Sequence, residues 1–223
     1  MIDVQQIPCD NAVPWLLHRH YAKRLCPMSY AFGAFRGAEM IGVVTYGTPA
    51  SSPLRTGIAG QRWAHIVLEL NRLCCENTPN TASKLVGRSL SMLPKPSLVV
   101  SFADTAQGHV GYVYQACNFL YTGLSAKRTD WKVRGQEHLH GATIADQSRG
   151  QPHRAEWMRA KYGADFYLEA RPRKHRYLYV CASKSQRRAI VSDLLYPVEP
   201  YPKGESLRYE ISDNTPTQSR LEF

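Results

Sequence analysis

Apolar and polar positions follow the most regular pattern between Ile66 and Gly123, which we take as the centre of the fold. The apolar segment 66–75 predicts a strand, and the turn-rich sequence ENTPN follows it. The next residues place apolar side chains on one helical face: Ala82, Leu85, Val86, Leu90 and Leu93. The segment 97–104 predicts a second strand, 108–119 a short helix, and FLYTG the start of a third strand. The order is therefore β-loop-α-β-α-β.

This order predicts an α/β fold with an anion site at the start of its first central helix. The loop ENTPN feeds a helix N-terminus, where free backbone N–H groups and the helix dipole favour an anionic group such as a phosphate. Side chains on this helix that can hydrogen-bond or neutralise the phosphate of a bound donor molecule are Ser83, Lys84, Arg88 and Ser89.

The flanking segments predict further elements. Residues 10–25 predict a helix that Asp10 caps and Pro27 ends. Residues 30–47 predict a β-hairpin, because glycines punctuate two apolar runs. The Pro-, Ser- and Gly-rich stretch 48–60 predicts a loop, and its length favours a functional loop or lid over a plain connector.

The C-terminal half is less regular. Residues 156–162 predict a short helix ended by Gly163, and the alternating segment 173–182 predicts a strand with a basic approach. We divide the chain into a domain of residues 1–182 and a tail of residues 183–223. The last ~20 residues are polar and predict a disordered or peripheral end.

Composition excludes several classes of protein. Apolar residues make up 43% of the chain, but none of its apolar runs approaches the ~18 residues that a membrane span needs. The N-terminal sequence MIDVQQIPCD lacks a signal peptide, so we expect a cytoplasmic protein with no membrane partner. The six cysteines form no CxxC and no zinc-finger spacing with histidine, which predicts buried, reduced thiols.

The charge pattern points to a polyanionic partner. The net charge is +10, and basic residues with interleaved aromatics concentrate at about 126–180. Phosphates attract such cations and bases stack on such rings, so this region predicts nucleic-acid contact; the alternative is a solvated basic face with core aromatics. The candidate contacts are Lys127, Arg128, Trp131, Arg171, Arg173, Lys174 and Arg176.

Three central residues are candidates for chemistry, each with a structural alternative. Asp104 ends a predicted strand, where α/β sheets commonly bind ligands, but it can instead cap the next helix. Tyr114 shares an apolar helix face with Val113, so we expect it to point inward, whereas Tyr112 points away. An inward Tyr114 is either a proton donor at the site or a tyrosine of the apolar core. Glu69 is a candidate base on its strand or lies on an exposed strand face.

The central stretch resembles the GNAT (Gcn5-related N-acetyltransferase) superfamily. The segment from Tyr114 to Phe119 matches the end of that family's fourth helix and the aromatic that opens the next strand. The family's glycine-rich phosphate loop is absent here, and only Gly87 lies nearby. The resemblance implies a mixed central sheet flanked by helices, here with a basic C-terminal extension. It also implies acetyl-CoA as donor and Tyr114 as the acid that protonates the leaving thiolate.

Several segments together more closely resemble the bacteriophage Mom family, a divergent GNAT-like group. They are HRHYAKR, AFGAFRG with MIGVVTYG, ELNRL, SFADTAQGHVGYVYQACNFLYTG and RPRKHRYLYV. The resemblance implies a phage transferase that converts adenine N6 in duplex DNA to N6-(methylcarbamoyl)adenine and blocks host restriction. It carries over His20, Tyr21, Asp104 and Tyr114 as catalytic residues, and an iron site at His20, Asp104 and Tyr114.

The resemblance also sets the partners and leaves rival functions open. Its substrate is double-stranded DNA with the adenine flipped out, because N6 is blocked inside the duplex. The donor is acetyl-CoA or another acyl or aminoacyl donor, the setting is the infected host cytoplasm, and a homodimer is compatible with the sequence. The rivals are a conventional acetyl-CoA-dependent N-acetyltransferase for a protein or small molecule, and a non-catalytic GNAT-like DNA-binding module.

Overall fold

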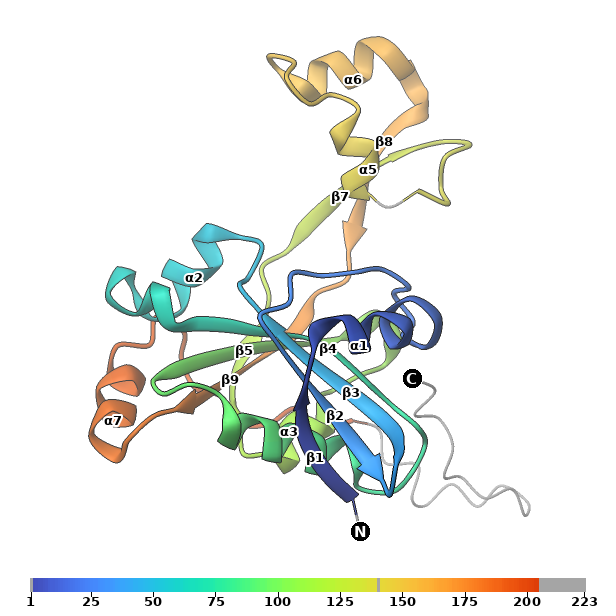
Figure 1. Ribbon diagram of the computed structural model, residues 1–223. Helices are drawn as coiled ribbons and strands as arrows, with labels where there is room; N and C mark the ends of the chain where they lie inside the picture. Colours follow the sequence, from blue (N-terminus) through green and yellow to red (C-terminus); the bar gives the residue numbers. More distant parts are fainter. Residues whose placement is uncertain (1, 140, 205–223) are drawn as a thin grey trace, which may run out of the picture.

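The computed structural model describes residues 2–139 and 141–204. A seven-stranded mixed sheet has the order β1-β2-β3-β4-β5-β9-β6, and a separate two-stranded ribbon pairs β7 with β8 (Figure 1). The central sheet consists of β1 (Ile2–Ile7), β2 (Tyr30–Arg36), β3 (Glu39–Gly47), β4 (Val67–Cys75), β5 (Ser97–Asp104), β9 (Lys174–Cys181) and β6 (Leu120–Leu124). All neighbours in this sheet are antiparallel except β4 and β5, which are parallel.

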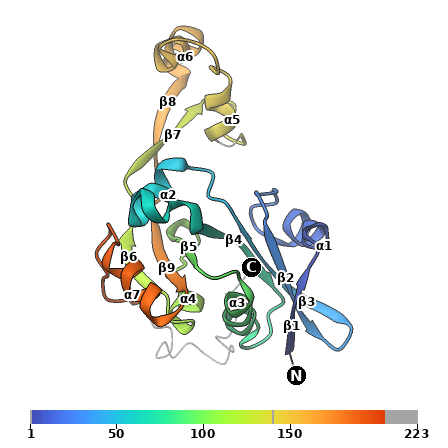
Figure 2. The ribbon, with the colours of Figure 1, turned by 60° about the vertical axis from the view of Figure 1, so that its left-hand side comes forward.

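Helices cover both faces of the central sheet (Figure 2). One face carries α3 (Thr81–Met92) and α4 (Tyr112–Ala116), whose apolar side chains pack into the larger core cluster. The other face carries α1 (Cys9–Pro14) with the π-helical turn Trp15–Arg19, α2 (Ser52–Ala59) with the 3-10 turn Gln61–Ile66, and α7 (Lys184–Ser192). The predicted mixed α/β sheet flanked by helices is confirmed.

The ribbon strands β7 (Arg128–Val133) and β8 (Phe166–Arg171) project away from the central sheet together with α5 (Gly141–Asp146) and α6 (Arg154–Tyr162) (Figures 1 and 2). We call residues 128–171 the ribbon arm. The arm has a small core of its own: Val133, Ile144, Met158 and Phe166. It therefore extends the protein beyond the sheet without sharing the sheet's main core.

Most of the regular patterns predicted the right element. The β-α-β-α-β order of the central stretch is confirmed by β4, α3, β5, α4 and β6. The hairpin is confirmed as β2 and β3, the short helix as α6 and the basic strand as β9. Gly163 follows α6 with a φ of 53°, a left-handed conformation that favours glycine and ends the helix there.

The expected helix over 10–25 is wrong at its C-terminal end. The backbone N–H of His20 bonds to the carbonyl of Trp15 at 2.9 Å, five residues back, so the last turn is a π-helix. His20 itself is extended, with a ψ of 137°. The side chain of His20 then accepts a hydrogen bond from the backbone N–H of Ala22. Helical periodicity in the sequence does not reveal this break, because it depends on these hydrogen bonds.

Other local predictions need correction. The expected loop 48–60 contains α2, which has a proline in its first turn and buries Ile58 and Ala59 against the sheet. The expected tail contains α7, which begins with a capping box between Ser183 and Gln186 and buries Ile190. The predicted disorder at the chain end falls on 205–223, outside the described residues. No helix in the described part is long and apolar enough to cross a membrane.

Candidate active site

The parallel strands β4 and β5 stop pairing halfway along their length. Their ladder runs only from Val67–Leu98 to Leu70–Ser101, although β4 continues to Cys75 and β5 to Asp104. At the last pair the Ser101 hydroxyl donates to the Leu70 carbonyl at 3.0 Å. Ligands of open α/β sheets bind at the carboxyl ends of parallel strands. This unpaired end of β4 and β5 is therefore the candidate active site.

A bulge in β4 sets which side chains face which side of this site. Thr45 pairs with Arg72 and Tyr46 pairs with Leu70, which leaves Asn71 without a partner. The Asn71 amide donates to the Pro27 carbonyl at 2.7 Å and accepts a hydrogen bond from the Thr45 hydroxyl at 2.6 Å. Bulges re-aim side chains next to active sites. Here the extra residue breaks the strict alternation that the sequence pattern assumes.

Tyr114 approaches the site from the face that carries α3 and α4. Its ring packs against Phe119 and Tyr177, with centroids 5.3 Å away in both cases. Burial raises the pKa of Tyr114 to about 12, and a hydrogen bond with Ser101 opposes this only in part. Tyr112, two residues earlier, is 58% exposed. The predicted inward and outward orientations are confirmed, and the Tyr114 phenol keeps its proton at neutral pH.

Carboxylates approach from the opposite face. Asp104 follows Val100 and Phe102 by strand alternation, and these two residues pack toward α2 and α7. One Asp104 oxygen accepts from Lys174 at 2.8 Å, and the other accepts the backbone N–H of Ala106 at 3.1 Å. Asp104 thus makes the capping contact of the structural alternative and also an ion pair at the site.

Glu69 lies on the same face as Asp104 and is largely buried. Burial raises the pKa of Glu69, while the nearby cations of Arg72 and Lys174 lower it. Lys174, which forms the ion pair with Asp104 on β5, is therefore close enough to Glu69 on β4 to lower its pKa. A carboxyl group with a raised pKa is better matched to accepting a proton near neutral pH than an ordinary one.

His20 and Tyr21 follow the π-helical turn rather than lying on a helix. His20 is 6% exposed, and its Nδ1 accepts the backbone N–H of Ala22 at 3.0 Å. Burial and the positive charge of Arg72 lower the pKa of His20 to about 4, so the imidazole is neutral. Tyr21 stacks on His20 with ring centroids 4.4 Å apart and contributes to the raised pKa of Tyr114.

Arg72 is the residue that sequence reasoning missed. Its Nη1 donates to the Asn71 carbonyl at 2.7 Å, and its Nε is buried with no hydrogen-bond partner among the described residues. The charge of Arg72 acts on both His20 and Glu69. The available signal was an arginine inside the apolar run HIVLELNRLCC, because a cation on a buried strand needs a reason to be there.

The predicted iron site finds no support. Across residues 2–139 and 141–204, no three His, Cys, Asp or Glu side chains gather closely enough to hold a metal ion. Asp104 is paired with Lys174, and the Nδ1 lone pair of His20 is already used. Arg72 also lowers the pKa of His20, and the same positive charge disfavours a bound cation. The residues therefore do not fit the predicted metal.

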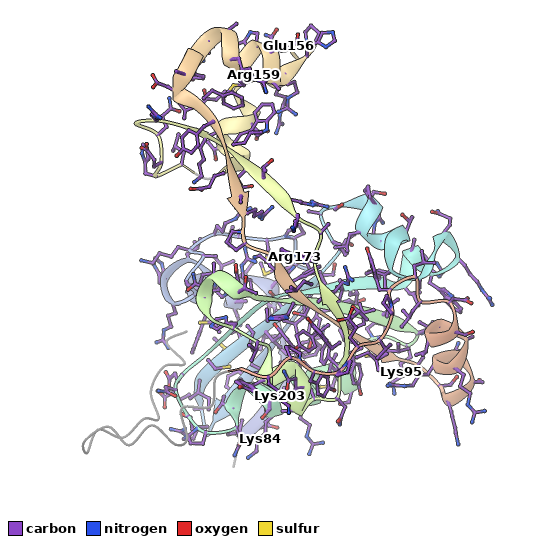
Figure 3. All side chains as sticks on the ribbon, turned by 180° about the vertical axis from the view of Figure 1, so that it is seen from behind. Lys84, Lys95, Glu156, Arg159, Arg173 and Lys203 are labelled. Atoms are coloured by element: carbon purple, nitrogen blue, oxygen red, sulfur yellow. The ribbon has the colours of Figure 1, made fainter. Side chains whose placement is uncertain are left out.

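The predicted donor-binding residues of α3 separate into two groups. Ser83 lies in the first turn of α3. Lys84 and Arg88 are exposed, and Lys84 is labelled in Figure 3. Ser89 is instead fully buried, where its hydroxyl bonds to Tyr46 at 2.6 Å. Thr81, the first helical residue, is also buried, and its hydroxyl has no hydrogen-bond partner in the described part of the chain.

Three of the predicted nucleic-acid contacts are occupied inside the protein. Arg176 is 7% exposed. Its guanidinium donates to the Thr122 hydroxyl at 2.9 Å and to the Thr122 backbone carbonyl at 2.6 Å. Lys174 forms the ion pair with Asp104. Trp131 packs edge-on against Phe166, with centroids 5.2 Å apart, in the core of the ribbon arm. These three side chains therefore make contacts within the protein that stabilise the fold.

Arg173 is also held, whereas three other basic candidates remain accessible. Its guanidinium donates to the backbone carbonyls of Leu124 and Ser125, at the junction between the sheet and the ribbon arm (Figure 3). Lys127, Arg128 and Arg171 are exposed next to this junction. The structure thus narrows the predicted basic region to a small surface at the base of the arm.

Comparisons with known proteins place this geometry in context. A family model described as the Mom protein family matches residues 1–203. The chain is 28% identical over 207 residues to the methylcarbamoylase mom of Escherichia phage Mu, covering 90% of this chain and 83% of that protein. The fold is also similar to a GNAT-family acetyltransferase from Bacillus cereus, at 13% identity, a TM-score of 0.40, and coverage of 81% and 97% of the two chains. A putative acetyltransferase from Salmonella typhimurium, solved with its cofactor acetyl-CoA, is 7% identical with a TM-score of 0.44 and coverage of 82% and 96%.

Proposed function

The chain belongs to the Mom protein family, and we propose that it is a transferase that converts adenine N6 in duplex DNA to N6-(methylcarbamoyl)adenine. The observation that carries this proposal is the family match over residues 1–203, which includes every residue of the candidate active site. The phage Mu relative is named a methylcarbamoylase, which supports the group transferred. Modification of this kind protects phage DNA from host restriction.

The acceptor side of the proposed reaction is the face that carries Glu69 and Asp104. The exocyclic amine of adenine is a weak nucleophile, because its lone pair is delocalised into the ring. Asp104 accepts a hydrogen bond from the amine and orients it, and the Lys174 ammonium at 2.8 Å holds the carboxylate in place. Glu69, whose pKa burial raises, accepts the proton that the amine loses.

The donor side is the face that carries Tyr114 and α3. Tyr114 keeps its proton at neutral pH, because its pKa is about 12, and it gives that proton to the leaving atom of the donor. The N-terminal turn of α3, with Thr81, Ser83 and Lys84, binds the anionic part of the donor. Arg88 is one turn farther along and adds a positive charge.

The transferred group limits the identity of the donor. A methylcarbamoyl group contains a nitrogen that an acetyl group lacks, so acetyl transfer alone does not complete the product. Transfer of an acyl or aminoacyl group from an activated carbonyl leaves an amide on N6, whereas the methylcarbamoyl product has nitrogen on both sides of the carbonyl. We therefore propose an aminoacyl donor that supplies the nitrogen, with a further step that places this nitrogen next to the carbonyl; acetyl-CoA is the simplest acyl relative of such a donor. Adenine N6 is sterically blocked within stacked duplex DNA, so the target base leaves the stack before it reacts.

The first test is nucleoside mass spectrometry of plasmid DNA from cells that express the protein. A new deoxyadenosine species is expected, and its added mass separates methylcarbamoyl from acetyl. Tyr114→Phe removes the proton donor and is expected to slow modification by about 10²–10⁴, which is seen as loss of the modified species. Tyr112→Phe is the matched control, because this exposed tyrosine is two residues away on the same helix.

Glu69→Gln tests the proposed base in the same assay. It is expected to lower modification by a similar factor, while Glu39→Gln, at the exposed start of β3, leaves modification unchanged. Unmodified DNA in cells that contain folded wild-type protein would overturn the proposed function. In that case acetylation of a protein or small molecule becomes the function to test, with acetyl-CoA as the donor.

A further inference from the structure

The inference concerns how duplex DNA is held, and it rests on the proposed function. We propose that the ribbon arm lies along a groove of duplex DNA, and that a basic cluster at its base binds the phosphates beside the nucleotide being modified. The base cluster consists of Lys127, Arg128 and Arg171. A two-stranded β-ribbon has the dimensions to enter a DNA groove.

The two faces of the ribbon differ in what covers them. Trp131 and Val133 face α5 and α6 and form the arm's core with Phe166. By alternation, the opposite face carries the residue pairs Arg128–Arg171, Asp130–Glu169 and Lys132–Tyr167. The first residue of α5, Gly141, packs against Asp130 on this second face, so the middle of the face is partly covered. At the base of the same face, Arg128 and Arg171 are exposed. This exposed, charged base suits a hydrated, charged partner.

An unfavourable contact marks the base of this second face. Arg128 and Arg171 are direct cross-strand partners, and like charges in this position destabilise a ribbon. Lys127 adds a third positive charge beside them. Among the described residues, Arg171 forms a salt bridge only with Asp130, whose carboxylate is 3.9 Å from the arginine Nε, and the nearby Glu169 pairs with Lys132. The remaining cationic charge is available to an external anion.

The base cluster also lies close to the proposed chemistry. Arg171 precedes Lys174 by three residues, and Lys174 forms the ion pair with Asp104. Three extended residues span at most ~10 Å, so a phosphate at Arg171 is about one nucleotide from the active site. Phosphate contacts fix the register of a protein on DNA, and here they place one nucleotide at Asp104.

The junction between arm and sheet is fixed rather than loose. Arg173 donates to the carbonyls of Leu124 and Ser125, and the Ser125 hydroxyl accepts the N–H of Lys174 at 2.9 Å. The Thr105 hydroxyl, one residue after Asp104, donates to the Arg173 carbonyl at 2.5 Å. These contacts hold the base cluster in a set position relative to Asp104.

The decisive experiment measures binding of a fluorescent DNA duplex by the full chain between about 50 and 200 mM salt. Arg128→Gln with Arg171→Gln is expected to weaken binding at least about tenfold at low salt and to reduce the salt slope by about 2, because two phosphate contacts are lost. The matched control is Lys184→Gln with Arg188→Gln, which removes two exposed cations of α7 and is expected to change binding little. Equal binding by the two double variants would overturn the inference.

Two further variants separate a binding role from a structural one. Arg128→Lys with Arg171→Lys keeps both charges and is expected to restore most of the binding. Arg128→Gln alone removes the like-charge pair, so its melting temperature is expected to equal or exceed that of the wild type while DNA binding falls. A lower melting temperature together with failure of the lysine variant to bind would assign the arginines to folding instead.

The outcome is distinguishable from that of the proposed function. If wild-type DNA carries no modified adenosine, yet the arginine variant loses duplex binding, the ribbon inference stands and the transferase proposal fails. If plasmid DNA is modified equally by the wild type and the Arg128→Gln, Arg171→Gln variant, the transferase proposal stands and the ribbon inference fails.

Discussion

The central sheet and the ribbon arm bury very different amounts of apolar side chain. The sheet is covered on both faces, and its largest cluster includes Phe32, Tyr46, Leu85, Phe119 and Tyr177. The arm has four buried apolar residues in its core: Val133, Ile144, Met158 and Phe166. Because apolar burial supplies most of the favourable free energy of folding, we infer that the arm opens at a lower free energy than the sheet.

This difference matches the work proposed for each region. Proton transfer needs side chains held in fixed positions, and Tyr114, Glu69 and Asp104 all lie on or against the sheet. The accessible cations lie at the base of the arm, where hydrogen bonds of Arg173 to Leu124 and Ser125 join it to the sheet. The comparison teaches that stability is concentrated where geometry must be precise.

The largest effect is expected from a cavity in the sheet. Phe119 is fully buried between Tyr114 and Tyr179, with ring centroids at 5.3 and 5.2 Å. Phe119→Ala is expected to lower the free energy of unfolding by about 3–5 kcal/mol, because the space left behind does not collapse fully. Urea unfolding followed by circular dichroism measures this. A change below 1 kcal/mol would mean that the sheet does not set the global stability.

A cavity in the arm is expected to act locally. Met158 is fully buried in the arm's core, so Met158→Ala removes about 2–4 kcal/mol of packing there. We expect faster hydrogen exchange in β7 and β8, with exchange in β5 and the global urea midpoint unchanged. Mass spectrometry of peptides from the two regions reads both at once. Equal loss of protection in β5 would show that arm and sheet unfold as one unit.

Acid is expected to weaken the sheet through His20. The folded-state pKa of His20 is about 4, below the ordinary value of 6.5, so its contribution is complete above pH 6.5. That contribution is lost as pH falls from 6.5 toward 4, because the unfolded state binds the proton first; the loss is roughly 1–3 kcal/mol. Urea midpoints across this range measure it. His20→Asn is expected to flatten the curve, and His138→Asn, on the exposed surface of the arm, is expected to leave it unchanged.

The smallest effect is expected from an ion pair of the arm. Lys132 and Glu169 are 3.5 Å apart on the face of the ribbon opposite Trp131, and the lysine side chain is 18% exposed. Glu169→Gln is expected to cost less than about 1 kcal/mol, visible only in hydrogen exchange of the arm. Glu76→Gln breaks the exposed ion pair between Glu76, at the end of β4, and Arg19, and is the matching variant in the central sheet. A larger loss of hydrogen-exchange protection from Glu76→Gln than from Glu169→Gln would contradict the inference that the arm is the less stable region.

The sequence predicted elements wherever one period continued without interruption. The apolar stripe of α3 and the face that carries Val113 and Tyr114 follow the helical period, and both were placed correctly. The resemblance to the Mom family is confirmed by the family model over residues 1–203. Prediction failed where tertiary contacts override the local pattern, as at His20, where a π-turn ends the helix.

The site itself was only partly accessible from the sequence. Asp104 and Tyr114 were identified, but strand alternation and helix packing place them on opposite faces of the sheet, which argues against a shared metal ion. Ser89 was assigned to donor binding by its place in the sequence, yet it is buried against Tyr46. The catalytic and binding roles of these residues remain predictions.

The sequence by itself determined the α/β order, the inward face of α4 and the family, because these depend on local periodicity and on short motifs. Tertiary structure alone decided three other features: the bulge at Asn71, the ion pair between Lys174 and Asp104, and the burial of Arg176. Each depends on how strands far apart in the chain pair and where their ladders end. No local pattern carries that information, because pairing register is set by contacts between distant segments.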